Sequence, residues 1–271
     1  MTFFEVLTSA INDFIENGYD SEDRLEKWVA ALRKAAIASL KPESVLRNDI
    51  AKALETTFNR LVTRATVLNK HPSVSKYDLQ RIKPRLRSEL DRRIMASANL
   101  IKLNRAESID KTLRRFQGWA TSIPIGGSKI QNKVEEKIRI KKELYKSHFE
   151  ERRVIIDQNH KLISSINDIV ATDNGAIAAE WHSHWRQANY NYRKDHKERD
   201  LNVYLIRGSW ANNKGLVKGK FTDSITQPGE ETFCRCNYKY IYSLGKLPEN
   251  MLTVKGKNKL LTAKSKLDNI N

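Results

Sequence analysis

Cysteine is scarce in this chain, and its two residues, Cys234 and Cys236, are separated by a single arginine. Two cysteines cannot supply the disulfide framework that stabilises small secreted proteins. Positions i and i+2 of an extended segment also point to the same side, without the separation and geometry that a disulfide needs. The sequence therefore excludes a disulfide-rich fold and predicts a chain that is made in the cytoplasm.

Long hydrophobic runs are also missing. No stretch approaches the ~18 consecutive apolar residues of a membrane-spanning helix. Residues 1–7 combine neither a basic start nor a long apolar core. We therefore expect no signal peptide and no membrane partner.

Acidic residues are too few to balance the basic ones. The chain has 49 Lys and Arg against 32 Asp and Glu, which gives a net charge of +17. This surplus favours a polyanionic partner, most commonly nucleic acid, although solvated basic faces would produce the same balance. Because no base-reading motif is present, any contact with double-stranded DNA is expected to be independent of sequence and sensitive to salt.

Glycine and proline interrupt the first two thirds of the chain only rarely, and the apolar residues there recur at helical spacing. Ser21 is a suitable N-cap for one helix. Pro42 suits the first turn of the next, which breaks at residues 69–73. A third helical region follows, and Pro84 either starts it or kinks it.

Adjacent glycines at Gly126 and Gly127 mark the clearest interruption and predict a turn or hinge. Residues 129–170 then contain neither glycine nor proline, which predicts an unusually long helix. Its narrow apolar row needs a partner, either a neighbouring helix or another protein. The apolar row consists of Ile130, Val134, Ile138, Tyr145, Phe149, Ile156, Ile163 and Ile166.

Beyond this helix the sequence pattern changes. A shorter helix is expected from Ala176 to Tyr192, followed by strands at Val203–Ile206 and Tyr238–Tyr242. We therefore predict a mainly α fold with a small C-terminal α+β module and an extended helical N-terminal region that includes one long helix. The expected parts are a helical region at 1–123, the hinge and long helix at 124–175, the module at 176–250 and an extended, mobile basic tail at 251–271.

Two groups of basic residues are candidates for DNA contact. One lies on the third helical region and the other in the tail. Each could equally be a solvated face. The candidates are Arg81, Lys83, Arg85, Arg87, Lys255, Lys257 and Lys259.

The two cysteines and His196 form a candidate metal site. Thiolate and imidazole are the ligands that zinc prefers, and His182, His184 or Asp200 could complete a tetrahedron. The cysteine spacing is shorter than in most zinc sites. Buried thiols that share a hydrogen bond with a histidine are the alternative.

The same segment contains histidines next to carboxylates, such as His196 beside Asp195, and these are possible acid–base groups. However, the sequence has no phosphate loop, nucleophile elbow or His-Glu-x-x-His motif, so we expect no enzyme and no catalytic residue. A buried polar network is a simpler role, in which Arg193 would pair with Asp200 or Glu230.

The segment from Trp185 to Cys236 resembles the C-terminal signature of the Mu-F-like minor head proteins of tailed bacteriophages, which are also called head morphogenesis proteins. That signature contains a tryptophan in a helix, Arg-x-x-His, an Asp-Gly pair, Pro-Gly-Glu and Cys-Arg-Cys. In this chain, Asp200 is followed by Leu201 in place of the glycine. The matching residues are Trp185, Arg193, His196, Asp200, Pro228, Gly229, Glu230, Cys234, Arg235 and Cys236.

The resemblance implies a low-copy protein inside the phage head, made in the host cytoplasm and bound to the portal protein or the major capsid protein. It implies a role in head assembly, genome packaging or genome delivery, in contact with double-stranded DNA. No cofactor is implied, although zinc at the cysteines stays open. Two alternatives also stay open: a DNA-binding accessory protein outside the virion, and a metal-dependent nuclease or toxin-like enzyme built on the histidine and cysteine residues.

Overall fold

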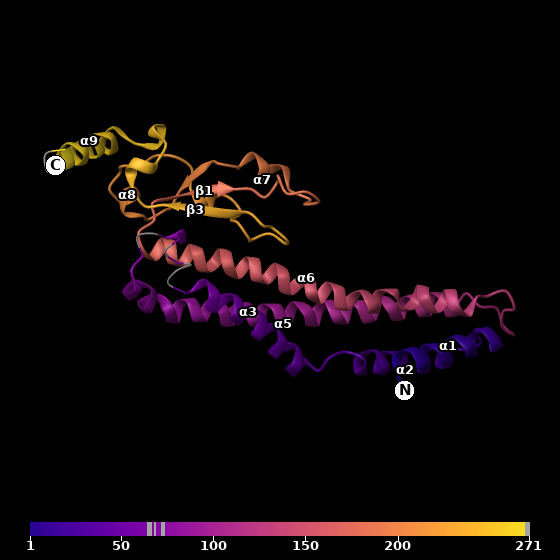
Figure 1. Ribbon diagram of the computed structural model, residues 1–271. Helices are drawn as coiled ribbons and strands as arrows, with labels where there is room; N and C mark the ends of the chain where they lie inside the picture. The colour runs from indigo at the N-terminus through magenta and orange to yellow at the C-terminus, as the bar shows by residue number, and fades with distance from the viewer. Residues whose placement is uncertain (64–66, 68, 72–73, 269–271) are drawn as a thin grey trace. The chain divides into compact units, whose positions relative to one another are not determined.

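The computed structural model of the chain describes residues 1–63, 67, 69–71 and 74–268, so part of the expected break at 69–73 lies outside the described residues. The chain divides into two compact units. The first unit comprises Met1–Ala51 and Ile94–Ile155, and the second comprises Lys52–Arg93 and Ile156–Asn271. The fold is mainly α with a small α+β part near the C-terminus, as the sequence predicted (Figure 1).

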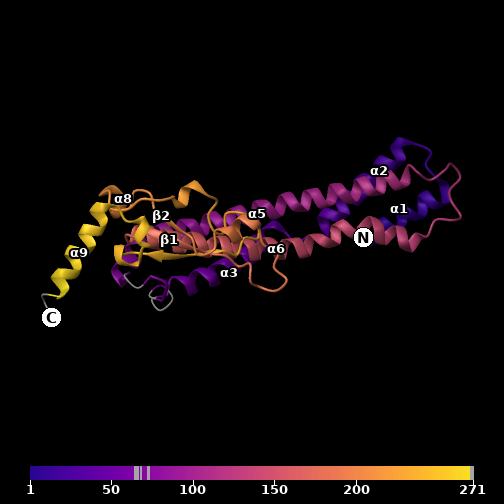
Figure 2. The same cartoon turned by 90° about the horizontal axis from the view of Figure 1, so that it is seen from above.

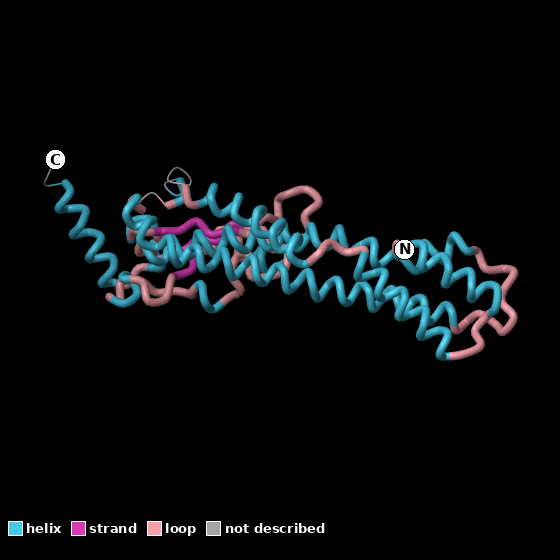
Figure 3. Tube along the Cα trace, turned by 90° about the horizontal axis from the view of Figure 1, so that it is seen from below, coloured by secondary structure: helices cyan, strands magenta, loops and turns pink. Residues whose placement is uncertain are grey.

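Helices make up most of the chain, and Figure 3 shows that the strands are confined to one region. The longer helices are α1 (Phe3–Asn17), α2 (Glu22–Ala38), α3 (Glu43–Leu61), α5 (Lys76–Ala120), α6 (Lys133–Asp173) and α9 (Val254–Asp268). The short ones are α7 (Lys194–Glu198), α8 (Trp210–Asn213), η1 (Thr222–Ser224), η2 (Leu244–Lys246) and η3 (Glu249–Met251). None of the helices in the described ranges combines the length and apolar character that crossing a bilayer requires.

The first unit is a helical bundle in which α1 and α2 lie side by side (Figure 2). A capping box between Thr2 and Glu5 starts α1. The core combines α1 and α2 with the end of α5 and the start of α6. Phe14 of α1 makes edge-to-face contacts with Phe116 and Trp119 of α5, at ring-centroid distances of 5.8 and 6.4 Å.

The expected turn at the two glycines is present between α5 and α6. Gly127 has a φ of +85°, and a Cβ there would lie 2.2 Å from the carbonyl oxygen of Ile15. Only glycine fits a position with both constraints. The backbone N–H of Ser128 donates to the same carbonyl, at 2.8 Å, so the turn closes against the end of α1.

Both long helices are continuous. Pro84 lies inside α5 and does not start it, and α6 runs unbroken for 41 residues. The predicted apolar row of α6 is, however, mostly exposed. Ile130, Val134, Ile138, Tyr145, Phe149 and Ile156 are between 43% and 95% exposed, while Ile140, Leu144, Val154, Leu162, Ile166 and Val170 are buried. The buried face therefore differs from the row that the sequence suggested, with Ile166 common to both, and Ile140 and Leu144 pack in the core shared with α1, α2 and α5.

The second unit contains an antiparallel sheet in the order β2-β1-β3. The strands are β1 (Ala178–His182), β2 (Val203–Leu205) and β3 (Asn237–Ile241). The two predicted strands are confirmed as β2 and β3, but the helix predicted from Ala176 to Tyr192 is wrong. Its first part is the central strand β1, which pairs with both neighbours: Ala179 lies opposite Tyr204 on one side and Tyr240 on the other. These tertiary partners override the helical preference of alanine.

The basic tail is not extended as expected, because residues 254–268 form α9, which leads away from the sheet (Figure 2). Thr253 caps this helix by accepting a hydrogen bond from the N–H of Gly256, at 3.1 Å. Gly256 lies so close to Leu216 that a Cβ would be 2.1 Å from its carbonyl oxygen. The start of α9 is thereby fixed to the module.

Candidate functional site

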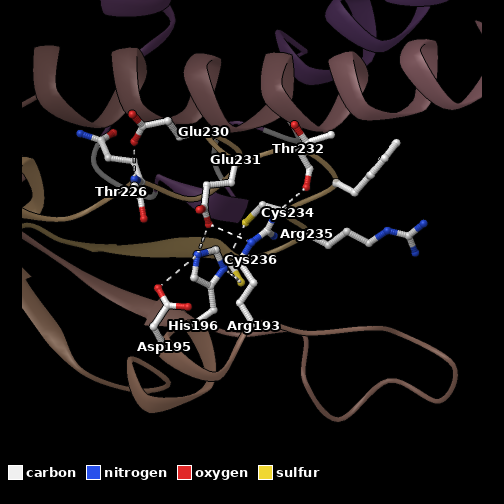
Figure 4. Close-up of polar contacts among 12 residues, drawn as sticks. Arg193, Asp195, His196, Thr226, Glu230, Glu231, Thr232, Cys234, Arg235 and Cys236 are labelled. Atoms are coloured by element: carbon white, nitrogen blue, oxygen red, sulfur yellow. Dashed lines mark hydrogen bonds and ion pairs between the residues drawn. The ribbon is translucent and has the colours of Figure 1, made fainter.

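His196, Cys234 and Cys236 form a buried cluster in the second unit, which we call the His–Cys cluster (Figure 4). His196 comes from α7, and the cysteines from the segment that enters β3. The imidazole Nδ1 lies 3.6 Å from the sulfur of Cys234 and 3.5 Å from that of Cys236. At 2%, 1% and 6% exposure, the three side chains are nearly closed off from solvent. Both thiols are free of any disulfide.

The opposite nitrogen of the imidazole faces carboxylates. Nε2 of His196 lies 2.6 Å from Oε2 of Glu231 and 3.8 Å from Oδ2 of Asp195. Arg193 holds Glu231 with a contact of 3.3 Å from Nε and donates from its guanidinium to the carbonyl of Thr232, at 3.0 Å. The imidazole is therefore held between two sulfurs and a carboxylate, as the dashed lines in Figure 4 mark.

The predicted partners of Arg193 are wrong, because among the described residues its ion pair is with Glu231 and not with Asp200 or Glu230. Glu230 instead accepts a hydrogen bond from the N–H of Gln227, at 2.7 Å, and so closes its own turn. Asp200 accepts from the N–H of Ser183, at 2.7 Å, and from the indole of Trp185, at 2.8 Å.

Asp200 fixes the loop that follows β1. Burial raises the pKa of its carboxyl, but the hydrogen bonds from Ser183 and Trp185 outweigh it and hold the pKa below its usual value. Trp185 lies in this loop and not in a helix. The next residue, Leu201, has a φ of +65°, the left-handed conformation that glycine adopts most easily. The backbone here thus has the shape that the Asp-Gly pair of the resembling signature would favour.

Pro228, Gly229 and Glu230 form a turn that rests on α6. Gly229 has a φ of +80°, and a Cβ there would lie 3.0 Å from the Cβ of Ser164. The hydroxyl of Ser164 donates to the carbonyl of Pro228, and Lys161 donates to the carbonyl of Glu230, at 3.1 Å. The Pro-Gly-Glu segment and Phe233, whose N–H donates to Asp157 at 2.5 Å, therefore dock residues 228–236, which we call the cysteine loop, on α6.

The two thiols of the cluster differ electrostatically. The pKa of Cys234 is lowered, chiefly because the Cys236 thiol donates a hydrogen bond to its sulfur, and the pKa of Cys236 is raised for the same reason. The backbone at Gly229 and Cys236 also lowers the pKa of Cys234, and that at His184 partly offsets the rise at Cys236. The pocket therefore favours a negative charge on the Cys234 sulfur and a protonated Cys236.

Arg235 lies between the cysteines but points away from the cluster (Figure 4). Its guanidinium lies 5.7 Å from the ring centroid of Tyr190, whose hydroxyl accepts a hydrogen bond from the Arg235 N–H at 3.2 Å. Arg235 and Cys236 both line a cleft of about 660 Å³, which we call the basic cleft. Its lining includes Lys70, Arg235, Lys239 and Lys246, the histidines His71, His160 and His182, and no Asp or Glu.

The remaining candidate ligands lie outside the cluster. His182 pairs with Glu180, at 2.7 Å, and His184 stacks edge-on against Tyr190. Glu231 was missed by the sequence interpretation, although it adjoins the predicted Glu230. Trp181 was also missed as a site residue: it is fully buried and lies edge-on to His196, with ring centroids 5.1 Å apart.

The predicted DNA-contacting arginines are largely paired with carboxylates. Arg81 and Arg85 contact Asp173, and Arg87 lies 2.9 Å from Glu55 and 3.4 Å from Asp91. These pairs reduce the positive charge that this helix presents.

The three candidate lysines of α9 differ in whether they have an ion pair. Lys257 pairs with Glu249, at 2.9 Å. Lys255 is exposed and has no ion pair among the described residues, and Lys259 lies 6.0 Å from the ring centroid of Trp210. Lys83 lines a small apolar pocket beside Leu79 and Leu86.

Comparison with known proteins returns no relative of this chain: no family model, no curated protein and no solved structure matches it.

Proposed function

We propose that this chain is a minor structural protein of a phage head, bound at the portal or inner capsid and in contact with packaged DNA. It would act in head assembly, genome packaging or ejection. The observation that carries the proposal is the convergence of the signature residues. Arg193 and His196 meet the Cys-Arg-Cys segment in one buried cluster, and the Pro-Gly-Glu turn docks that segment on α6. This convergence supports the view that the resemblance reflects a shared module.

The location of these residues favours a structural role over catalysis. The His–Cys cluster is nearly closed to solvent, and its polar partners are groups of the same module. A buried network of this kind fixes the relative positions of α7, the cysteine loop and the sheet. We therefore propose that the module is a rigid unit and that other surfaces make the contacts of the particle.

The exposed part of the apolar row on α6 is a suitable surface for a protein partner in the particle. Val134, Ile138, Tyr145 and Phe149 are between 56% and 64% exposed in the first unit. Their spacing places all four on one side of the helix. An exposed apolar stripe of this kind is typical of a helix that docks in a groove, and we propose the portal or capsid protein as its partner.

The contact with DNA is proposed for the free cations of the second unit. Lys255 has no ion pair among the described residues. The lining described for the basic cleft contains lysines and an arginine but no carboxylate, whereas the arginines of α5 are paired. Unpaired cations release the most counterions when they meet phosphates.

Mass spectrometry of purified particles of the phage that carries this chain tests the proposal. We expect the chain at low, fixed copy number in full heads. Retention after the DNA is emptied would indicate a portal- or capsid-bound component, and loss with the DNA would indicate an ejected one. Absence from both full and emptied heads would overturn the proposal in favour of an accessory protein or an enzyme.

A paired variant tests the docking surface. Tyr145→Ser with Phe149→Ser should lower incorporation into heads at least tenfold while leaving the circular dichroism spectrum unchanged. Leu103→Ser is the matched control, because Leu103 is 68% exposed on α5. Equal incorporation of both variants would contradict a docking role for the row.

A further inference from the structure

We propose that the sulfurs of Cys234 and Cys236 and Nδ1 of His196 bind one zinc ion. The donor atoms all lie within 4.8 Å of one another in the buried cluster. The inference concerns the module itself and does not depend on the proposed role in a phage head.

The distances between the donors match those of a tetrahedral zinc site. Zinc–sulfur bonds of ~2.3 Å and zinc–nitrogen bonds of ~2.1 Å at tetrahedral angles place a sulfur and a nitrogen ligand ~3.6 Å apart. The two sulfur–nitrogen distances here are 3.6 and 3.5 Å. Both sulfur–nitrogen distances therefore fit coordination of one ion by His196 and the two cysteines.

The far side of the imidazole has the partner that a metal-bound histidine requires. When Nδ1 coordinates a metal, Nε2 carries the proton, and a carboxylate commonly accepts it. Glu231 lies 2.6 Å from Nε2 and is itself held by Arg193. The present contact is an ion-pair distance without hydrogen-bond geometry, but Glu231 is close enough to accept the Nε2 proton when Nδ1 coordinates.

The chemistry of the donors selects the metal. The two sulfurs and the imidazole nitrogen converge in one buried cluster, with the hydroxyl of Ser183 at 3.9 Å from the Cys236 sulfur. Zinc binds cysteine as thiolate, so coordination would release the thiol protons. The soft donor set of two thiolates and one imidazole selects zinc over magnesium or calcium.

The fourth position of the tetrahedron is assigned to a water molecule from the basic cleft. Cys236 lines that cleft, so the cluster has a route to solvent. The hydroxyl of Ser183 lies 3.9 Å from the Cys236 sulfur and can form a hydrogen bond with this water, as donor or as acceptor. The three protein ligands leave one position of a tetrahedral zinc ion open.

Metal analysis of the full-length chain, purified without chelator, is the first test. We expect about one zinc per chain, and cobalt substitution should produce the thiolate-to-cobalt charge-transfer band of a site with two sulfur ligands. Cys234→Ser, Cys236→Ser and His196→Asn should each lower zinc affinity at least tenfold in competition with a chromophoric chelator. His182→Asn, in the neighbouring strand, should leave it unchanged.

A measurement on the unaltered chain covers the case in which these variants do not fold. Zinc should slow alkylation of both thiols by iodoacetamide, and a strong chelator should restore the fast rate. Glu231→Gln should weaken zinc binding by about 10- to 100-fold, as expected for the partner of a ligating histidine. Failure to take up zinc after reconstitution, or full zinc content in a folded His196→Asn variant, would overturn the proposal and leave a metal-free hydrogen-bonded cluster.

Discussion

Oε2 of Glu231 lies 2.6 Å from Nε2 of His196, on the side of the imidazole that faces away from the two thiols. The imidazole of His196, which belongs to α7, therefore contacts Glu231 on one side and both cysteines on the other. A change at either residue should affect the whole module, because the ring is 2% exposed and cannot exchange these partners for water.

Glu231→Gln should destabilise the second unit by about 1–2 kcal/mol, because the buried imidazole loses its charged partner. Hydrogen–deuterium exchange of the β1–β3 peptides in urea, with chelator present so that metal does not contribute, measures this change. Glu198→Gln, at an exposed position of α7, is the control and should stay within about 0.5 kcal/mol. If both substitutions lowered the stability equally, the contact of Glu231 with His196 would not stabilise the second unit.

Gly229→Ala should destabilise the same peptides by about 2–4 kcal/mol, since it combines a strained φ of +80° with a Cβ at 3.0 Å from that of Ser164. Gly208→Ala separates the two causes. Gly208 has a φ of +73°, but its added Cβ meets nothing within 4 Å. That control should cost only about 1–2 kcal/mol. If both variants lose the same stability, the close approach to α6 contributes nothing.

Arg105 and Glu151 form a buried ion pair in the first unit, with contacts of 2.7 and 3.2 Å, and Arg105 also donates to the carbonyl of Lys41, at 2.9 Å. Arg105→Met should cost about 3–5 kcal/mol because it leaves a buried carboxylate uncompensated. The double variant with Glu151→Leu should recover most of that loss. A double-mutant cycle of urea unfolding, read from α1 and α5 peptides, measures the coupling, and additive losses would contradict it.

His71 should make the stability of the second unit depend on pH. Burial lowers its pKa below the ordinary value of 6.5, and its ring contacts the hydroxyl of Tyr242 at 2.7 Å and the side chain of Asn167 at 3.2 Å. The folded state thus binds this proton less readily than the unfolded state. The stability that neutral His71 contributes to the folded state is complete above about pH 6.5. It is lost as the pH falls toward the pKa of His71 in the folded state.

Unfolding free energies between pH 7.5 and 5, on about half-unit steps, test this dependence. His71→Gln should flatten the acid side of the profile, whereas His148→Gln, at an exposed position of α6, should leave it as it is. An unchanged profile in His71→Gln would assign the dependence to other groups, such as His160, whose pKa is also lowered, chiefly by burial.

The sequence predicted the helices of the first two thirds of the chain because apolar residues recur there at helical spacing, whereas α9 in the lysine-rich tail was not predicted. Strand β1 could not be predicted in this way. Ala176 and Ala179 favour a helix locally, and the strand forms only because β2 and β3, from later in the chain, supply hydrogen bonds on both sides. The buried face of α6 likewise depends on which elements pack against it.

The His–Cys cluster was suggested by residue type, and the structure brings its three members together. The partner of Arg193 could not be read in the same way. Two adjacent glutamates were available, and the choice depends on the turn: Glu230 accepts from the N–H of Gln227, which leaves Glu231 to face His196. Such a choice between neighbours is made by backbone conformation and not by composition.

The lysines of α9 provide a matched test of the proposed DNA contact. Lys255 is exposed without an ion pair among the described residues, whereas Lys257, two positions later, pairs with Glu249. If the chain binds duplex DNA through free cations, Lys255→Gln should lower the slope of log affinity against log salt by about 0.9, the value for one phosphate contact. Lys257→Gln should change the slope less, because its charge is already partly neutralised. Fluorescence anisotropy with two duplexes of unrelated sequence measures both slopes, and a larger effect at Lys257 than at Lys255 would show that ion pairing does not decide which lysines meet the DNA.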